Sequence, residues 1–184
     1  MLVMKPYDRV RAVSYAERWA LSRNPLFVDY TGRGGNCTNF VSQSIYAGSC
    51  IMNYTPVFGW YYITDNQRAP AWTGVTYLFN FLTENVGVGP YGTQVGKEEV
   101  EVGDVVQLYR AAVGWYHSLL VVGIDEDGEL LLAAQSDDAY NRRLDSYTYE
   151  SVRFIHILGV RMSMPDTEDC YETLLAGEAI VTAE

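Results

Sequence analysis

The stretch VEVGDVVQLYR (residues 100–110) opens the part of the chain that decides the fold, because from there the apolar residues recur with a period of two. Three later runs repeat this pattern: WYHSLLVVGI (115–124), ELLLAAQS (129–136) and SVRFIHILGVR (151–161). Turn residues such as DEDG (125–128) separate the runs. We therefore predict four antiparallel strands in the C-terminal half of the chain.

The N-terminal half shows helical spacing instead. Apolar residues at i, i+3, i+4 and i+7 predict three helices. The first covers residues 8–21, the second begins at Cys37 and is capped at its C-terminal end by Gly48, and the third covers residues 73–85. Residues 52–72 are aromatic and turn-rich without a clean period, which indicates a surface excursion or a hairpin. Helices followed by strands are typical of the α+β class, so we expect N-terminal helices packed on an antiparallel sheet.

The composition fits one compact domain. The chain has 184 residues, of which 48% are apolar, so a hydrophobic core can hold it without disulfides or structural metal. Its cysteines, Cys37, Cys50 and Cys170, are odd in number and lack paired spacing, and they predict neither a disulfide framework nor a zinc site. We expect a domain over residues 1–161 and an acidic C-terminal tail over residues 162–184.

The charge of the chain disfavours some partners. A formal net charge of −10 opposes the electrostatic attraction that supplies most affinity for nucleic acids and anionic membranes. No apolar run approaches the roughly 18 residues of a membrane span, and the first residues lack the apolar core of a secretory signal. We expect no nucleic-acid partner, no membrane span and a cytoplasmic location, or a secreted one if a signal peptide was removed.

The segment GGNCTNFVSQ (34–43) places a thiol at the first turn of a predicted helix, directly after two glycines. The helix dipole and the free backbone N–H groups there favour an anion, which would lower the pKa of the thiol. Gly35 lets the backbone approach a substrate, Asn36 is placed to cap the helix, and N–H groups around Cys37 would hold a developing oxyanion. The alternative is that Cys37 is a small buried apolar residue.

A thiolate nucleophile needs a base, and the chain has two histidines. His117 opens a predicted strand after a loop whereas His156 lies within a strand, so we favour His117. If DEDG forms a type I turn with a glycine bulge, His117 faces Asp137, whereas a simple four-residue loop places Ser136 there. Gln135 and Asp137 share one face, and the sequence leaves open which of them orients the imidazole.

Aromatic residues gather around Trp60, where they either line a substrate groove or pack in the core. No glycine-rich phosphate loop follows a strand, and no spacing of cysteine, histidine and acidic residues indicates a metal site. We expect no cofactor and no metal.

Five stretches of the sequence carry a resemblance to a known family: residues 7–49, in which CTNFVSQ (37–43) is the most specific block, WTGVTYLFNFLTEN (72–85), VGDVVQLY (102–109), YHSLLVVG (116–123) and QSDDAYNRRLDSY (135–147). They resemble the amidase-domain family, a branch of the papain-like cysteine hydrolases related to NlpC/P60 and CHAP domains. The similarity runs over about residues 7–161. It implies a papain-like fold with Cys37 at the start of the central helix, His117 on the sheet facing it, and a third polar residue on the next strand.

We therefore predict a cysteine-dependent hydrolase that cleaves an amide or peptide bond through Cys37 and His117. Its substrate would be a peptide or amide, with peptidoglycan peptides and N-acyl amino acids as candidates. The resemblance aligns Gln135 with a position that is commonly histidine, which motivates the alternative of a catalytically impaired papain-fold binding module. A second alternative is an acyltransferase that uses the same thiol.

Overall fold

The computed structural model describes residues 1–163 and 169–178. In these residues the helices are α1 (Arg9–Trp19), α2 (Cys37–Ser49), α3 (Pro70–Thr73), α4 (Val75–Glu84), α5 (Tyr171–Ala176) and the 3₁₀ turns η1 (Lys97–Glu99) and η2 (Leu144–Ser146). The strands are β1 (Val3–Lys5), β2 (Tyr62–Thr64), β3 (Gln67–Arg68), β4 (Gly89–Val95), β5 (Val105–Arg110), β6 (Gly114–Ile124), β7 (Leu130–Ala134), β8 (Ala139–Arg143) and β9 (Ser151–Met162).

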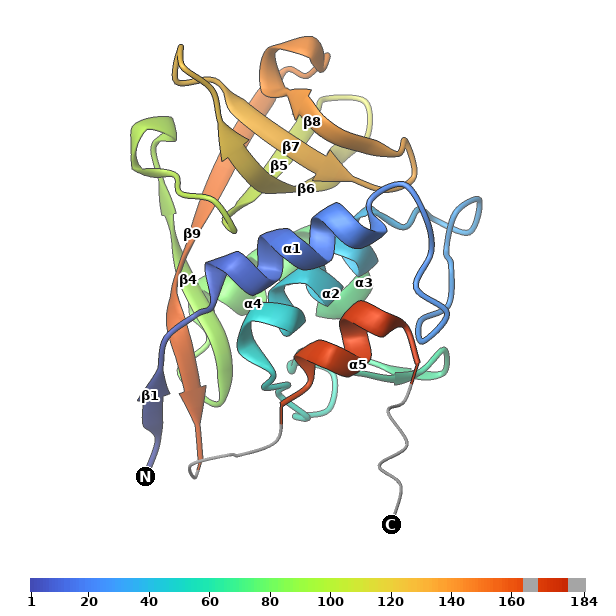
Figure 1. Cartoon of the computed structure of the whole chain (residues 1–184), viewed down its shortest axis with the longest axis vertical. Coiled ribbons are helices and arrows are strands. Elements are labelled where there is room, and N and C mark those ends of the chain that lie inside the picture. The colour runs from blue at the N-terminus through green and yellow to red at the C-terminus, as the bar shows by residue number, and fades with distance from the viewer. Residues whose placement is uncertain (164–168, 179–184) are drawn as a thin grey trace.

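One antiparallel sheet forms the frame, with the order β1-β9-β5-β6-β7-β8 and β4 paired to the other side of β9. The helices gather against this sheet, and α1, α2 and α4 all contact β6 (Figure 1). The prediction of an α+β fold with helices packed on an antiparallel sheet is confirmed. In the described part of the chain, no helix is both long and apolar enough to cross a bilayer.

Helix α1 follows its sequence pattern closely. The Asp8 side chain caps the helix by accepting a hydrogen bond from the backbone N–H of Arg11. The stripe Ala12, Tyr15, Ala16 and Trp19 is buried, as the i, i+3, i+4 spacing predicted.

Helix α2 is the central helix, because every one of its residues except Tyr46 is buried. The prediction that Gly48 caps it is wrong. Gly48 lies inside the helix, where a Cβ atom would come within 2.6 Å of both the Asp8 carbonyl oxygen and the Tyr7 ring. The glycine therefore serves close packing. The helix ends at Ser49, and the next residue, Cys50, caps it in a left-handed conformation with φ of 53°.

The aromatic segment 52–72 is only partly on the surface. A short hairpin of β2 and β3 forms there, but Trp60 and Trp72 are fully buried, with their ring centroids 4.7 Å apart. Thr73, the first residue of the predicted helix over residues 73–85, ends α3 instead, and α4 begins after Gly74. The prediction of a surface excursion is therefore wrong for the two tryptophans, because aromatic spacing without a period does not separate core from rim.

All four predicted strands are present, as β5, β6, β7 and β9. Three further strands of the main sheet, β1, β4 and β8, escaped the sequence pattern. They are short or begin with glycine and proline, as in GPYGTQV of β4, which pairs with β9 over its whole length.

The hairpin between β6 and β7 combines both predicted registers. At the turn the N–H of Asp125 donates to Glu129 O, which is the arrangement with a glycine bulge at Gly128. A bulge between Val121 and Gly123 then shifts the pairing by one residue, so that Leu120 faces Ala133. The pairing of β6 with β7 ends at Leu120 and Ala133, so His117 is paired with neither of its predicted partners, Asp137 and Ser136.

Cys50 and Cys170 form a disulfide, with Cα atoms 5.4 Å apart and positions 120 apart in the sequence. The prediction of no disulfide is therefore wrong, because sequence spacing says nothing about a bridge formed by tertiary contact. The bridge ties the end of α2 to the segment before α5, and Leu174 of α5 is buried. Of the predicted tail 162–184, residues 164–168 and 179–184 lie outside the described residues.

Candidate active site

The loop before α2 sets the position of Cys37. Gly34 and Gly35 have φ of 98° and 101°, a left-handed region that a side chain would strain. The N–H groups of Arg33 and Gly35 both donate to the carbonyl oxygen of Tyr30, at 2.8 and 3.2 Å. These bonds fold the loop back on itself, so that α2 begins at the thiol.

Asn36 locks this loop but does not cap the helix through its side chain. Its Oδ1 accepts hydrogen bonds from the backbone N–H of Tyr30 and from Asn39 Nδ2, both at 2.9 Å. Its Nδ2 donates to Gln135 Oε1, and its backbone N–H donates to Ser136 Oγ. That backbone N–H is therefore already engaged, and Asn36 does not line the cavity described below.

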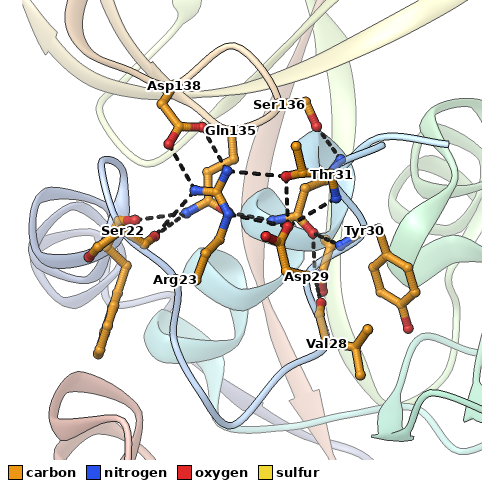
Figure 2. Close-up of polar contacts among 12 residues, drawn as sticks. Ser22, Arg23, Val28, Asp29, Tyr30, Thr31, Gln135, Ser136 and Asp138 are labelled. Atoms are coloured by element: carbon orange, nitrogen blue, oxygen red, sulfur yellow. Dashed lines mark hydrogen bonds and ion pairs between the residues drawn. The ribbon is translucent and has the colours of Figure 1, made fainter. Parts of the chain in front are cut away.

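Gln135 holds the same loop from the sheet side. Its Nε2 donates to the carbonyl oxygens of Trp19 and Ser22 at the end of α1, at 2.7 and 2.8 Å (Figure 2). Its oxygen accepts from Asn36, so the Gln135 amide connects the thiol loop to the end of α1 from its own position directly after β7. The structure thus places Gln135 in a scaffold and not at the imidazole.

A second set of polar contacts, centred on Arg23, lies beside Gln135, and the sequence did not predict it. Arg23 binds Asp138 through two hydrogen bonds of 2.9 Å and makes an ion pair of 3.2 Å with Asp29 (Figure 2). Arg23 also donates to Thr31 Oγ1 at 3.2 Å. The thiol loop is therefore clamped between α1 and the segment after β7, and no local sequence signal pairs residues 115 positions apart.

His117 lies on β6 beside an irregularity in the sheet. The pairing of β5 with β6 shifts between Leu108 and Tyr109, a bulge of the kind that re-aims a side chain. The centroid of the imidazole lies 6.0 Å from that of the Tyr116 ring and 6.1 Å from that of the Tyr147 ring. Among the residues that the structure describes, neither ring nitrogen of His117 has a hydrogen-bond partner.

Cys37 and His117 line one cavity of about 390 Å³. Both side chains are almost buried, at 7% and 8% exposure, and no direct hydrogen bond joins them within the described residues. Of the other predicted site residues, Gly35 and Asp137 lie in the lining. The full lining comprises Gly34, Gly35, Cys37, Arg110, Tyr116, His117, Ser136, Asp137, Arg142, Tyr147 and Thr148.

Burial dominates the electrostatics of this pair. It raises the pKa of the Cys37 thiol, while the backbone N–H of Ser118 and the hydroxyl and N–H of Thr38 act in the opposite direction. Burial also lowers the pKa of His117 to about 4, with the charge of Asp137 raising it and that of Arg142 lowering it. The sequence predicted a lowered thiol pKa, whereas the structure holds a neutral thiol and a neutral imidazole at neutral pH.

A chain of buried polar groups leads to the sulfur from behind. Arg153 Nε donates to Gln107 Oε1 at 2.8 Å, and Gln107 Nε2 donates to Ser118 Oγ at 3.2 Å. Ser118 Oγ lies 2.9 Å from Thr38 Oγ1, which lies 3.8 Å from Cys37 Sγ. Because a guanidinium can only donate, it fixes the Gln107 amide with its oxygen toward Arg153 and its NH₂ group toward Ser118. The hydroxyls of Ser118 and Thr38 can then each donate to the next group, which ends the chain with a donor to Cys37 Sγ.

Trp60 is not at this cavity. It is fully buried, its indole N–H donates to Ser42 Oγ at 3.0 Å, and its ring packs against Trp72 and Phe81. A larger cavity of about 490 Å³ lies near Phe58 and α4, but its lining contains neither cysteine nor histidine. Within residues 1–163 and 169–178, no three side chains of histidine, cysteine or acidic type cluster to hold a metal ion.

Comparisons with known proteins place the chain in a family. It is 32% identical over 148 residues to YhbB of Bacillus subtilis (strain 168), described as an uncharacterized protein, and the match covers 78% of this chain. The chain spans 45% of the length of that relative. No solved structure matches the chain. Residues 6–158 match the family described as "Putative amidase domain", and the chain belongs to this family.

Proposed function

We propose that this protein is a cysteine-dependent hydrolase that cleaves an amide or peptide bond, with Cys37 as nucleophile and His117 as base. Membership of an amidase-domain family supports hydrolysis of an amide as the reaction class. The observation that carries the cysteine mechanism is the shared cavity, which presents the sulfur from the start of α2 and the imidazole from β6.

Cys37 and His117 carry the covalent and proton-transfer steps of the proposed reaction. His117 takes the proton of the Cys37 thiol, and the sulfur attacks the carbonyl carbon to form a tetrahedral oxyanion. The imidazolium then protonates the leaving amine, the C–N bond breaks and a thioester remains. Water, deprotonated by His117, attacks the thioester, and the proton returns to the sulfur as the acid leaves.

The neutral pair fits general-base catalysis better than a preformed ion pair. A thiol with a raised pKa stays protonated in the free protein and an imidazole with a pKa of about 4 stays neutral, so no ion pair forms before the substrate binds. In unliganded enzymes the hydrogen bonds of catalytic groups are often long and tighten only with substrate, so the missing bond between Cys37 and His117 does not argue against the pair.

We assign the third position to Asp137. The hydrogen-bonding groups of Gln135 are engaged by α1 and Asn36, whereas Asp137 lines the cavity and its charge acts on His117. A carboxylate at this point stabilises the imidazolium that forms during the reaction. A buried helix that presents a cysteine to a histidine on an antiparallel sheet also supports the papain-like relationship that the sequence motifs suggest.

The Cys50–Cys170 disulfide supports an extracytoplasmic site of action, because disulfides persist mainly in oxidising compartments. Peptide bonds of the cell wall would be accessible there. We therefore rank peptidoglycan peptides above intracellular amides as candidate substrates.

A substrate screen with peptidoglycan fragments and N-acyl amino acids tests the function, comparing the wild type with Cys37→Ala and, as a matched control, Cys50→Ala/Cys170→Ala. We expect hydrolysis by the wild type and the double variant, and none by Cys37→Ala. Under non-reducing conditions Cys37 is the free cysteine, so mass spectrometry also locates a trapped thioester. Activity retained in Cys37→Ala would contradict the cysteine mechanism.

A further inference from the structure

We propose that the cavity takes substrates that carry a carboxylate near the scissile amide, and that Arg110 is the residue that recognises this carboxylate. The inference rests on the proposed function, because the carboxylate would belong to the substrate that Cys37 attacks.

The charges in the cavity wall are unusual for this protein. The chain as a whole carries a formal net charge of −10, yet the lining contains two arginines and one acid. Arg142 and Asp137 form an ion pair of 3.2 Å, and Arg142 also donates to Ser146. The charges of Asp137 and Arg142 offset one another in the net charge of the lining, so Arg110 gives the lining a net charge of one positive unit.

The guanidinium of Arg110 is held in place without being neutralised. Its Nε and Nη2 donate to the carbonyl oxygen of Thr148 at 3.2 and 2.9 Å. The guanidinium carbon lies 4.8 Å from the centroid of the Tyr116 ring, and the hydroxyl of Tyr116 donates to the same carbonyl oxygen at 3.1 Å. In the described part of the chain, no carboxylate lies within ion-pair distance of Arg110.

This arrangement suits a carboxylate ligand. A preoriented guanidinium loses little conformational freedom on binding, and its planar N–H groups match a carboxylate. The acidic protein would otherwise repel an anionic substrate, so a local cation in the cavity lining also gives selectivity over neutral amides. Thr148 and Tyr116 supply the support that fixes the side chain.

Two alkylating reagents of similar size test the charge preference without a known substrate. Iodoacetate carries the carboxylate and iodoacetamide is its neutral amide. With both, a bond forms between the Cys37 sulfur and the CH₂ carbon as the C–I bond breaks, iodide leaves and the thiol proton passes to solvent. We would measure the ratio of their rate constants for Cys37 at low ionic strength in the wild type, Arg110→Gln, Arg110→Lys and the control Arg18→Gln. Arg18 stacks on Trp19 and does not line the cavity.

We expect the iodoacetate-to-iodoacetamide ratio to fall about fivefold in Arg110→Gln, the size of one charge interaction in a solvated site. Arg110→Lys would retain part of the ratio, Arg18→Gln would retain all of it, and added salt would reduce the wild-type ratio. An unchanged ratio in Arg110→Gln would overturn the carboxylate site alone. Failure of both reagents to label Cys37 in the folded wild type would instead contradict the proposed nucleophile and the carboxylate site with it.

Discussion

The two histidines lie on the same sheet but in opposite kinds of surroundings. His156 Nδ1 lies 2.8 Å from the fully buried carboxylate of Asp104, which also binds Arg9 at 2.7 Å and the N–H of Ile157 at 3.0 Å. His117 faces a cavity and, within the described residues, has no hydrogen-bond partner. A closed network of paired charges stabilises the fold, whereas polar groups left unpaired at a cavity are available for a ligand.

The largest expected effect separates the two histidines by activity. His117→Gln removes the proposed base and should lower the rate of amide hydrolysis about a thousandfold, within the range for loss of a general base. His156→Gln can still donate to Asp104 and should leave the rate nearly unchanged. Steady-state kinetics on the substrate found in the screen, with folding checked by circular dichroism, measures both. Equal losses would mean that the two surroundings do not differ in function.

The second prediction compares the carboxylate beside each histidine, Asp104 beside His156 and Asp137 beside His117, and here the larger loss of stability is expected beside His156. Asp104→Asn leaves Arg9 without its buried charge partner, at a cost of about 3–5 kcal/mol in the free energy of unfolding. Asp137→Asn affects a side chain that is 78% exposed and should change that free energy little while lowering activity. Urea unfolding and kinetics of both variants measure the contrast. A large loss of stability in Asp137→Asn would contradict its placement at the cavity.

The third effect concerns the pH dependence of stability. Burial lowers the pKa of His117 from 6.5 to about 4, so the unfolded chain binds a proton more readily than the folded one in that window. Stability from this residue is therefore present above pH 6.5 and lost as the pH falls toward 4, by about 3 kcal/mol in all. As the pH falls from 6.5 to about 4, the unfolding free energy of the wild type, measured at several pH values, should therefore fall relative to that of His117→Gln, which has no group titrating at this position. A difference independent of pH would contradict the buried neutral imidazole.

Local features were predictable from the sequence. The i, i+3, i+4 spacing of α1 reflects burial of one face of the helix, which the residues themselves encode. The central strands β5 and β6 are instead buried on both faces, and their apolar, β-branched runs identified them as strands. The pair of Cys37 and His117 followed from a thiol at a helix start and a chain with two histidines. The structure brings these two residues to one cavity.

Features that depend on distant contacts were not predictable. The Cys50–Cys170 bridge joins residues 120 apart, and Gln135 became a scaffold residue because the end of α1 approaches it in three dimensions. The register of β6 and β7 is an intermediate case. Gly123 within a strand is a known signal for a bulge, and it marks the point where the predicted pairing shifts.

The smallest effect probes the chain of hydrogen bonds behind the sulfur. Thr38→Val keeps the shape of a side chain that is 1% exposed but removes the hydroxyl that favours the thiolate. The pKa of Cys37 should rise further, and alkylation by iodoacetamide at neutral pH should slow about fivefold to tenfold, the value of one hydrogen bond. Thr83→Val is the matched control, since its hydroxyl bonds to Phe79 O within α4. The pH profile of alkylation should move to higher pH with a plateau at least as high as that of the wild type, because the fraction of thiolate falls at a given pH while a more basic thiolate is somewhat more nucleophilic. A lower plateau at an unmoved midpoint would show that Thr38 shapes access to the sulfur and not its ionisation.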